Sequence, residues 1–562
     1  MSRWSEAAWK TNFFLTFFSV LISLFSFSAN RYWVGGTGNW SDVNHWSTAS
    51  NGAPGASVPT VADNAIFDLN SGLTSIATTV TLDVALSVSD FDFATVPNAF
   101  TISSVLTSIE IRGSLLSNGL ASILYTGDIV MTSASPTSNL LSNGQIWNNN
   151  FVIDGLTSAD GVTLSDDFMT LKGISNTTGK FISNGFNIEC NNFTSILGGG
   201  RTINLSSSIV TINGTNWNLV NGTIPLPLVW SAPDSIIFTN ITTNNFSGGN
   251  QVYNIISSAG STFVLNGSNS FTNLILPQSS TLELANNSSN VFTNLNINGT
   301  CSSPFTIETT DNALLNASIE VTGSPTWNAQ GLSITNTNAI GSTVYEVAIS
   351  TVTDGIGWTY SGANFYWIGN GGDWNDVNHW SNSSGGPVSG CIPTVLDSVF
   401  FDNLSFSLAN QTVLVDDTAF FKSMDWTGIV GSQNLALDSN IIAHGDVTLN
   451  SNLTVYRNIV GSGIQFERAA QIVINAASMD CNVLVSTNTN TAIVELMDNL
   501  SMSDSSSILL FNGGFKTNNN DVAVGSLISI NNPSTATDGR SLNLGASQVI
   551  LKQKFSTQGD TS

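Results

Sequence analysis

The feature that most constrains this chain is an internal repeat. The segment YWVGGTGNWSDVNHWS at Tyr32–Ser47 returns 334 positions later as YWIGNGGDWNDVNHWS at Tyr366–Ser381. Further Pro-Thr, Asp and Phe-Asp positions in residues 59–68 recur at the same offset in residues 393–402. A repeat of this length indicates two copies of one module, so the fold is expected to be built from repeated units.

The repeat sets the expected domain organisation. Each copy begins with an aromatic stretch, which we call the tryptophan segment, and a series of short strand-like segments follows it. We expect a signal peptide at residues 1–29, a tryptophan segment at 30–78, a β-solenoid at 79–345, a linker at 346–363, a second tryptophan segment at 364–410 and a second β-solenoid at 411–562. The second copy is the shorter one, and we expect it to be truncated.

The strand-like segments have a shared signature. An aliphatic residue, any residue and a glycine end alternating stretches at Ile111–Gly113, Ile153–Gly155, Leu171–Gly173, Ile212–Gly214, Leu265–Gly267 and Ile297–Gly299. Alternation with a period of two is typical of half-buried strands, and Gly and Asn suit the sharp corners between them. These patterns predict an all-β fold, a right-handed parallel β-helix (β-solenoid), in which coil length is free to vary.

The alternative fold is a row of tandem antiparallel β-sandwiches. That fold needs hairpin signals at intervals of about 8 to 12 residues. The Asn-Gly pairs of this chain end strands without a matching strand directly after them. We therefore favour the solenoid, and at ~22 residues per coil the first module should be a rod of about 12 coils and ~58 Å.

The two tryptophan segments share the positions of their aromatic rings. These positions are Trp33, Trp40 and Trp46 in the first copy and Trp367, Trp374 and Trp380 in the second, with His45 and His379 beside them. One hypothesis is that the rings cover the otherwise open end of each solenoid. The other is a sugar-stacking platform with Asp42, Asn44 and His45 as polar partners. Because the spacing of the aromatic residues is the same in both copies, we predict that four of them are mostly buried: Trp40, Trp46, Trp374 and Trp380.

Charge excludes several kinds of partner. Only 9% of residues are charged, the net charge is −24, and no Lys or Arg occurs between Arg201 and Lys422. A phosphate backbone needs a basic face, so nucleic acid is excluded as a partner, and anionic membrane surfaces are disfavoured. The low charge and the surplus of Ser, Thr and Asn are typical of an all-β extracellular protein.

The N-terminus predicts export. Arg3 and Lys10 precede an apolar run from Phe13 to Phe25, and small residues follow up to Ala29. This order is that of a secretory signal peptide, and the apolar run is too short to span a bilayer as a helix. We expect a secreted, extracellular or cell-surface protein with no membrane insertion after cleavage of the signal.

Four cysteines, Cys190, Cys301, Cys391 and Cys481, are widely spaced and form no CxxC pair, which argues against a zinc or redox motif. A disulfide is possible in an oxidising compartment, but a chain of this size does not need one to fold. We expect the four thiols to be free and buried.

The tryptophan segments resemble a known type of repeat. YWVGGTGNWSDVNHWS, the Ser-Gly-Gly-rich stretch that ends in Ile392–Thr394, residues 397–402 and the Gly355–Trp358 lead-in are similar to tryptophan-headed repeat modules of large secreted surface proteins of Bacteroidota-type bacteria. Shorter relatives of the pattern occur in autotransporter-like passenger regions. The resemblance implies an exported β-helical surface protein linked with adhesion. Many such proteins carry a C-terminal sorting domain, and none is evident in this sequence.

An enzyme on the same scaffold is the rival hypothesis. A polysaccharide lyase needs clustered cations, and those of the first module are scattered. A glycoside hydrolase needs two converging carboxylates, but the neighbours Asp166 and Asp167, or Asp416 and Asp417, point to opposite faces of a strand. His444 stands alone, and no nucleophile-elbow motif supports a serine hydrolase. We expect no catalytic residues.

No cofactor is expected, although calcium is a possible ligand of the tryptophan segments. Asp63, Asp68, Asp397 and Asp402 provide carboxylate oxygens at matching positions of the two copies. The alternative is that these aspartates cap turns by accepting hydrogen bonds from nearby backbone amides.

These observations favour a secreted or cell-surface structural protein of adhesin type, which presents polar, acidic faces to glycans or to other cell-surface or matrix proteins. The alternative is a polysaccharide-degrading enzyme, a lyase or glycoside hydrolase, on a β-helix scaffold.

Overall fold

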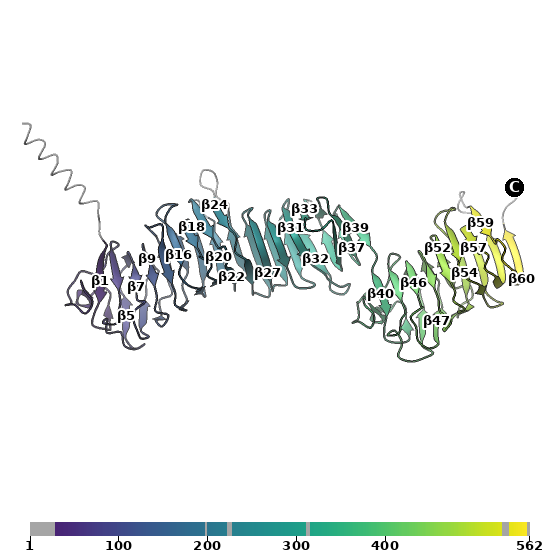
Figure 1. Ribbon diagram of the computed structural model, residues 1–562, viewed down its shortest axis with the longest axis horizontal. Helices are drawn as coiled ribbons and strands as arrows, with labels where there is room; N and C mark the ends of the chain where they lie inside the picture. Colours follow the sequence, from purple (N-terminus) through teal and green to yellow (C-terminus); the bar gives the residue numbers. More distant parts are fainter. Residues whose placement is uncertain (1–27, 197–198, 222–227, 311–314, 531–538, 559–562) are drawn as a thin grey trace, which may run out of the picture.

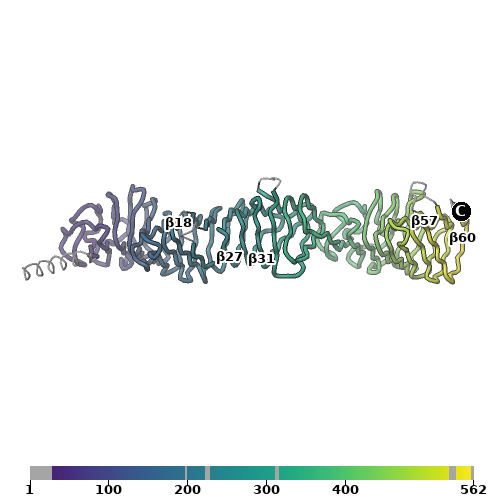
Figure 2. Tube along the Cα trace, turned by 90° about the horizontal axis from the view of Figure 1, so that it is seen from above, coloured from purple at the N-terminus to yellow at the C-terminus, as the bar shows by residue number. Residues whose placement is uncertain are grey.

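The computed structural model describes residues 28–196, 199–221, 228–310, 315–530 and 539–558. Most of the predicted signal peptide lies outside these residues. The described chain is 49% strand and 1% helix, and its parallel coils stack into a β-solenoid of about 21 turns. Figures 1 and 2 show an elongated body with the strands side by side along its length. The solenoid prediction is confirmed, and the alternative of antiparallel sandwiches is wrong.

Three strands form a typical coil of the first module. In one coil, β7 (Phe91–Asp92), β8 (Thr101–Ser104) and β9 (Ser108–Ile111) follow one another, and each pairs in parallel with its counterpart in the next coil. The counterparts are β10 (Leu115–Leu116), β11 (Ser122–Ile123) and β12 (Asp128–Met131). The faces of the solenoid are therefore parallel sheets that run along its axis.

One long strand turns a corner between two faces. β18 (Gly173–Ile182) pairs through its first residues with β20 (Asn192–Ser195) and through its last residues with β21 (Arg201–Asn204). A third face is a separate sheet of ten strands. Its strands are β14 (Ile146–Trp147), β17 (Phe168–Thr170), β19 (Ile188–Cys190), β22 (Ile209–Ile212), β25 (Ser235–Phe238), β27 (Val252–Ser258), β29 (Ser270–Ile275), β31 (Ser289–Asn296), β33 (Ala317–Val321) and β36 (Thr337–Ala339).

The first module continues through the predicted linker, because residues 346–363 contain two strands that pair with its preceding coil. Its closing strands are β34 (Thr326–Gln330), β35 (Leu332–Thr335), β37 (Val344–Ala348), β38 (Thr351–Thr353) and β39 (Trp358–Ser361). The second module opens with β40 (Asn364–Trp367), β41 (Gly372–Asp373), β42 (Trp380–Ser381), β43 (Ser398–Phe400) and β44 (Thr412–Val415). Its later coils end with β57 (Ser507–Lys516), β58 (Val522–Ile530), β59 (Arg540–Asn543) and β60 (Val549–Gln558).

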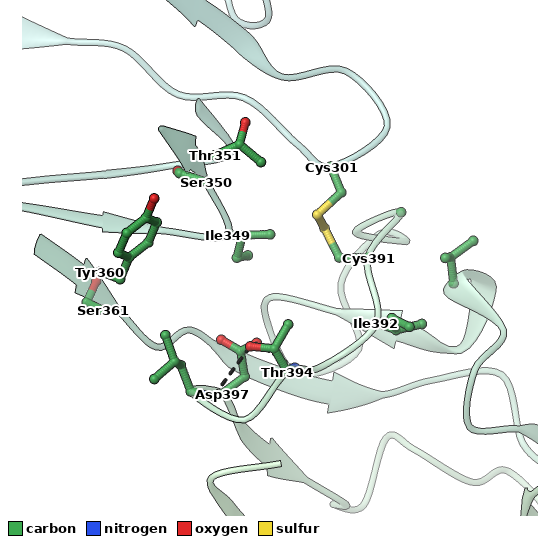
Figure 3. A pocket seen from close by; sticks show the side chains of 13 residues that line it. Cys301, Ile349, Ser350, Thr351, Tyr360, Ser361, Cys391, Ile392, Thr394 and Asp397 are labelled. Atoms are coloured by element: carbon green, nitrogen blue, oxygen red, sulfur yellow. Dashed lines mark hydrogen bonds between the residues drawn. A yellow bond between two sulfur atoms is a disulfide. The ribbon is translucent and has the colours of Figure 1, made fainter. Parts of the chain in front are cut away.

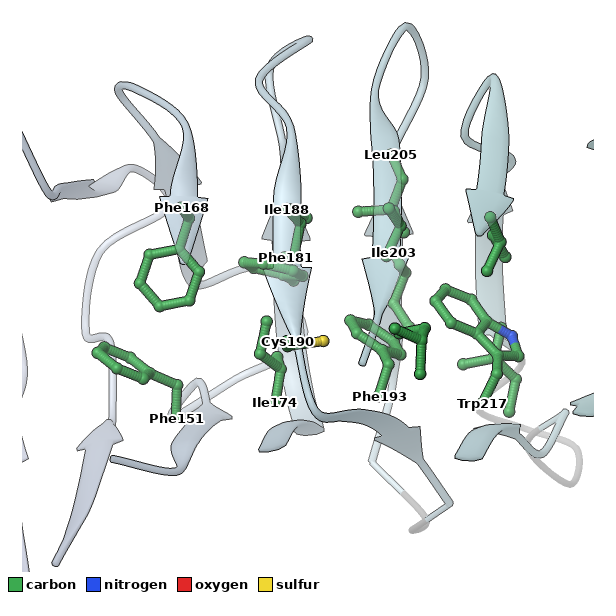
Figure 4. Close-up of a cluster of buried hydrophobic side chains, with 14 of the residues drawn as sticks. Phe151, Phe168, Ile174, Phe181, Ile188, Cys190, Phe193, Ile203, Leu205 and Trp217 are labelled. Carbon is green, nitrogen blue, oxygen red and sulfur yellow. The ribbon is translucent and has the colours of Figure 1, made fainter. Parts of the chain in front are cut away.

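The interior of the coils is filled by columns of apolar side chains. Ile174 pairs with Phe193 of the next coil, and Phe193 pairs with Trp217 of the one after. The Phe193 and Trp217 rings stack with centroids 4.5 Å apart. Figure 4 shows these side chains pointing inward from successive coils, with Cys190 among them. Two separate clusters of buried residues result, one from Trp33 to Val347 and one from Phe365 to Leu527.

Polar side chains at the corners form ladders along the outside. Asp90 N–H donates to Asn64 Oδ1 (3.2 Å), Ser114 N–H donates to Asp90 Oδ1 (2.6 Å), and Asn139 N–H donates to Ser114 Oγ (3.1 Å). Each side chain thereby satisfies a backbone amide one coil further on, where the ladder of strands is interrupted. This role suits the surplus of Asn and Ser in the chain.

The cysteine prediction is half wrong. Cys190 and Cys481 are free and buried, as expected, but Cys301 and Cys391 form a disulfide. Their sequence separation of 90 gave no sign of contact. The pair meets because Cys301 lies in a loop at the end of the first module and Cys391 in the tryptophan segment of the second.

Candidate functional site

The first tryptophan segment forms the beginning of the solenoid. β1 (Ala29–Trp33) pairs in parallel with β4 (Asp63–Ile66) on one side and with β3 (Trp46–Ser47), antiparallel, on the other. β2 (Gly38–Asn39) extends the neighbouring face by pairing with β5 (Thr79–Leu82). The outer edge of β1 is therefore covered by β3, which reduces the risk that it pairs with another chain.

Three tryptophans form the core of this cover. Trp33, Trp40 and Trp46 are each at most 1% exposed. Trp40 and Trp46 meet edge to face with centroids 4.7 Å apart, and Trp46 Nε1 donates to the Trp40 carbonyl oxygen at 2.8 Å. Trp33 Nε1 donates to the Gly36 carbonyl oxygen at 2.7 Å. Each indole is thus buried and is hydrogen-bonded or packed within its own segment, which is the arrangement of a packing cluster.

His45 belongs to the same cluster. Its ring stacks on Trp33 with centroids 4.7 Å apart, and its Nδ1 lies 2.8 Å from the Val34 carbonyl oxygen. A carbonyl oxygen only accepts, so Nδ1 carries the proton of this bond. Gly38 is required here because a Cβ at this position would lie 2.0 Å from His45 Nε2.

The second tryptophan segment repeats the arrangement. Trp367, Trp374 and Trp380 are fully buried, and β40 pairs antiparallel with β42 as β1 does with β3. His379 stacks on Trp367 with centroids 4.7 Å apart. The predicted burial of Trp40, Trp46, Trp374 and Trp380 is confirmed. The burial of these six rings favours the covering role over the sugar platform, because stacking on a sugar needs an exposed face.

The polar partners of the suggested platform have structural roles. Asp42 caps the 3-10 helix η1 (Val43–His45) by accepting from Asn44 N–H at 2.9 Å. Asp376 caps η2 (Val377–His379) in the same way through Asn378 N–H. That backbone hydrogen bond, assisted by the Asn378 side chain and His379, holds the pKa of Asp376 below its usual value.

The four aspartates suggested for calcium cap turns. Asp63 accepts from the Thr60 amide (2.9 Å) and hydroxyl (2.7 Å), and Asp397 does the same with Thr394. Asp68 accepts from Asn70 N–H, and Asp402 accepts from Leu404 N–H, both at 2.9 Å. Among the described residues, no group of three or more His, Cys, Asp or Glu side chains is placed to hold a metal ion. The geometry favours the turn-capping alternative.

The carboxylates weighed for catalysis are engaged locally. Asp166 accepts from the amides of Ser142 and Asn143, and Asp167 accepts from that of Asn187. Asp416 and Asp417 each accept from the amide of the residue that follows. His444 Nε2 lies 3.1 Å from Glu467 Oε2. These contacts join neighbouring coils or turns and give each of these side chains a local structural partner.

The site that the sequence did not reveal lies between the modules. A cleft of about 420 Å³, shown in Figure 3, is bounded by the end of the first module and by the second tryptophan segment. Ile349, Tyr360 and the hydroxyls of Ser350, Thr351 and Ser361 line one wall, and Ile392, Thr394 and Leu396 line the other. The Cys301–Cys391 disulfide spans the two walls. Interfaces between domains are common places for binding clefts, so this junction cleft is a candidate site.

One residue of the cleft has an unusual backbone. Ile349 has φ +51°, in the left-handed region that β-branched residues rarely enter. Its side chain packs against the hydrophobic core of the second module although Ile349 belongs to the first. Neither the sequence position nor its neighbours indicate this conformation.

Comparison of the chain with known protein families, curated proteins and solved structures gives no match. Within the described part of the chain, no helix is long and apolar enough to cross a membrane.

Proposed function

We propose that this chain is a secreted or cell-surface structural protein of adhesin type, whose polar, acidic faces contact glycans. The observation that carries the proposal is the outer surface of the solenoid. Asn273 and Asn294 hydrogen-bond across adjacent coils at 2.9 Å, as do Thr239 and Asn213 at 2.8 Å. Such ladders repeat amide and hydroxyl groups along an extended face, where many weak contacts can add up.

Export is supported by three independent features. The leader-like N-terminus has the order of a signal peptide, only 9% of the residues are charged, and Cys301 is disulfide-bonded to Cys391. Disulfides persist mainly in oxidising, extracytoplasmic compartments. A rod of stacked coils in that location suits a role in display or adhesion.

The net charge of the chain limits which glycans we propose as ligands. With a net charge of −24, the faces repel anionic polymers at low salt. Neutral glycans, or those with amino sugars, are the partners that this surface favours. Protein partners of the cell surface or matrix are the competing outcome.

The test is binding of the chain without residues 1–29 to an array of neutral, amino and acidic glycans, with heat-denatured protein as control. We expect weak, multivalent binding to neutral or amino glycans that free oligosaccharide competes away. Absence of binding to any glycan would contradict the proposal. Release of reducing ends or unsaturated products from a polysaccharide would favour the rival enzyme.

A further inference from the structure

The two modules touch through a small set of contacts, which we call the joint. At Gly362, which follows the last strand of the first module, a Cβ would lie 1.6 Å from the Leu396 carbonyl oxygen, so the two backbones meet closely there. Ile349 adds one apolar contact with the second core. The contacts at the joint are few compared with the continuous ladders of hydrogen bonds inside each module. The modules are therefore expected to move relative to each other unless something else holds them.

The disulfide is that additional tie. Cys301 lies between β31 and β32 (Phe305–Thr309), and Cys391 lies between β42 and β43, with Cα atoms 5.4 Å apart. The two loops are in direct contact, because a Cβ at Gly390 would lie 2.7 Å from Ser302 Oγ. Cys391 is 4% exposed, whereas Cys301 is on the surface. One sulfur of the bond is thus attached to an accessible residue.

Ile349 makes the joint sensitive to displacement of the second module. A β-branched residue in the left-handed region stores strain, which persists only while surrounding contacts hold it there. Ile349 lies in the turn between β37 and β38, where Leu332 N–H donates to Ser350 Oγ at 2.9 Å, and its side chain packs on the second module. When the second module moves away, this apolar contact is lost while the turn remains in the first module.

The first tryptophan segment supplies an internal control. The position 334 residues before Cys391 is Ser57, and the one before Phe365 is Arg31. No module precedes this first segment among the described residues, and there Arg31 Nε donates to Ser57 Oγ at 3.1 Å. Cysteine and phenylalanine replace this polar pair in the segment that meets another module. The cysteine therefore serves the joint and is not needed to fold a tryptophan segment.

We propose that the Cys301–Cys391 disulfide is a thiol-releasable latch that sets the orientation of the two solenoid modules. An extracellular dithiol, in its thiolate form, attacks Cys301 Sγ and forms a mixed disulfide, and Cys391 leaves as the thiolate. The second thiol of the reagent then attacks its own sulfur in the mixed disulfide and releases Cys301. The dithiol is oxidised to a disulfide, the protein gains two thiols, and the joint opens at Ile349.

Thiol counting on the folded chain is the first test. Before reduction, no cysteine should react with a thiol reagent. After mild reduction with a dithiol, Cys301 and Cys391 should react, while Cys190 and Cys481 stay protected because both are buried. Burial raises the pKa of the Cys481 thiol to about 12, which lowers its reactivity further. Reaction of all four thiols would mean that reduction unfolds the modules, and this would contradict a latch confined to the joint.

Hydrogen exchange and small-angle scattering then test the motion. In the reduced chain, the amide of Cys391, which donates to Ser389 Oγ in the loop that the disulfide holds, should exchange about tenfold faster or more. The amides of Phe193 and Val483, inside the two modules, should keep their rates, and the scattering should report a wider range of particle lengths. The Cys301→Ser/Cys391→Ser variant should match the reduced chain, and Cys190→Ser is the control that should match the oxidised chain.

Two results would overturn the latch. Unchanged exchange at Cys391 and an unchanged scattering curve after complete reduction would show that the other contacts fix the orientation alone. Faster exchange inside both modules would show that the bond stabilises the solenoids themselves. Reduction of folded wild-type protein answers the question even if the double variant does not fold.

Discussion

The two tryptophan segments share a core and differ in what surrounds it. In both, three tryptophans and a histidine pack beneath a short antiparallel strand, with stacking distances of 4.7 Å between histidine and tryptophan. In the first segment, Arg31 forms an ion pair with Asp63 at 3.6 Å. In the second, the matching aspartate, Asp397, accepts from Ala363 N–H, and Phe365 is buried at the position of Arg31. The aromatic core thus begins the solenoid in either setting, and the flanking residues differ between the first segment and the segment that meets a preceding module.

The largest expected effect tests the shared core. Trp46→Ala and Trp380→Ala should each destabilise the chain by about 3 to 5 kcal/mol, because each removes a buried indole and its hydrogen bond to the preceding tryptophan. Chemical denaturation followed by tryptophan fluorescence and circular dichroism measures this loss. Tyr360→Ala is the matched control, because Tyr360 is 50% exposed and its loss should cost little. Equal midpoints for Trp46→Ala and the parent would mean that the shared aromatic core is not a packing cluster.

The next prediction separates the two tryptophan segments at one matching position. Phe365→Ala should cost about 3 to 5 kcal/mol, because the ring is buried and meets Trp380 edge to face with centroids 6.2 Å apart. Arg31→Ala should cost less, about 1 to 2 kcal/mol, since it removes an ion pair with Asp63 and a hydrogen bond to Ser57 Oγ but no buried ring. Denaturation midpoints of both variants measure the difference. Equal losses of stability in the two variants would contradict the proposed difference between the first and the second tryptophan segment.

A smaller effect is expected from the glycine that accommodates each histidine. A Cβ at Gly38 or Gly372 would lie 2.0 or 1.9 Å from the histidine Nε2, so alanine should displace the ring from its tryptophan. Gly38→Ala and Gly372→Ala should each cost about 1 to 3 kcal/mol. Gly173→Ala is the control, because its nearest contacts would be at 3.5 Å. If the histidine resonances of the Gly38→Ala and Gly372→Ala variants remain those of the parent, the packing explanation fails.

The smallest effect concerns pH. The backbone hydrogen bond from Asn378 lowers the pKa of Asp376 in the folded chain, so the carboxylate stabilises the fold above its unfolded pKa. This contribution is lost as the pH falls through the lowered folded pKa. The variant Asp376→Asn should therefore lose less stability than the parent on acidification below about pH 4. Denaturant midpoints measured across that range test this, and parallel curves for the two proteins would contradict it.

The sequence predicted the parts of the structure that depend on local pattern. Alternation around Ile212 or Leu265 indicates a strand, and the glycine or asparagine that follows indicates a corner. The identical spacing of Trp40 and Trp46 with Trp374 and Trp380 indicated burial. These signals reside in neighbouring residues, so they can be read without knowing the coil lengths.

What could not be predicted depends on how coils of unequal length stack. Trp217 pairs with Phe246 and Phe246 with Leu265, and these steps differ in length along the chain. A small error per coil accumulates, so the contact of Cys301 with Cys391 cannot be predicted from spacing. The packing of Ile349 against the second module likewise depends on how the coils stack. The junction cleft was missed because both of its walls depend on this stacking.

The ladders of strands also define how the rod responds to force. In Figure 1 the strands lie across the long axis, so tension between the ends pulls on the hydrogen bonds between adjacent coils along their own direction. Such a geometry opens a few bonds at a time, and the rod should lengthen by peeling one coil after another at modest, nearly constant tension. The covalent bond between Cys301 and Cys391 interrupts that sequence, because the 90 residues of separation between them cannot be drawn out while it is intact. The same bond that orients the modules therefore limits how far the rod can be stretched.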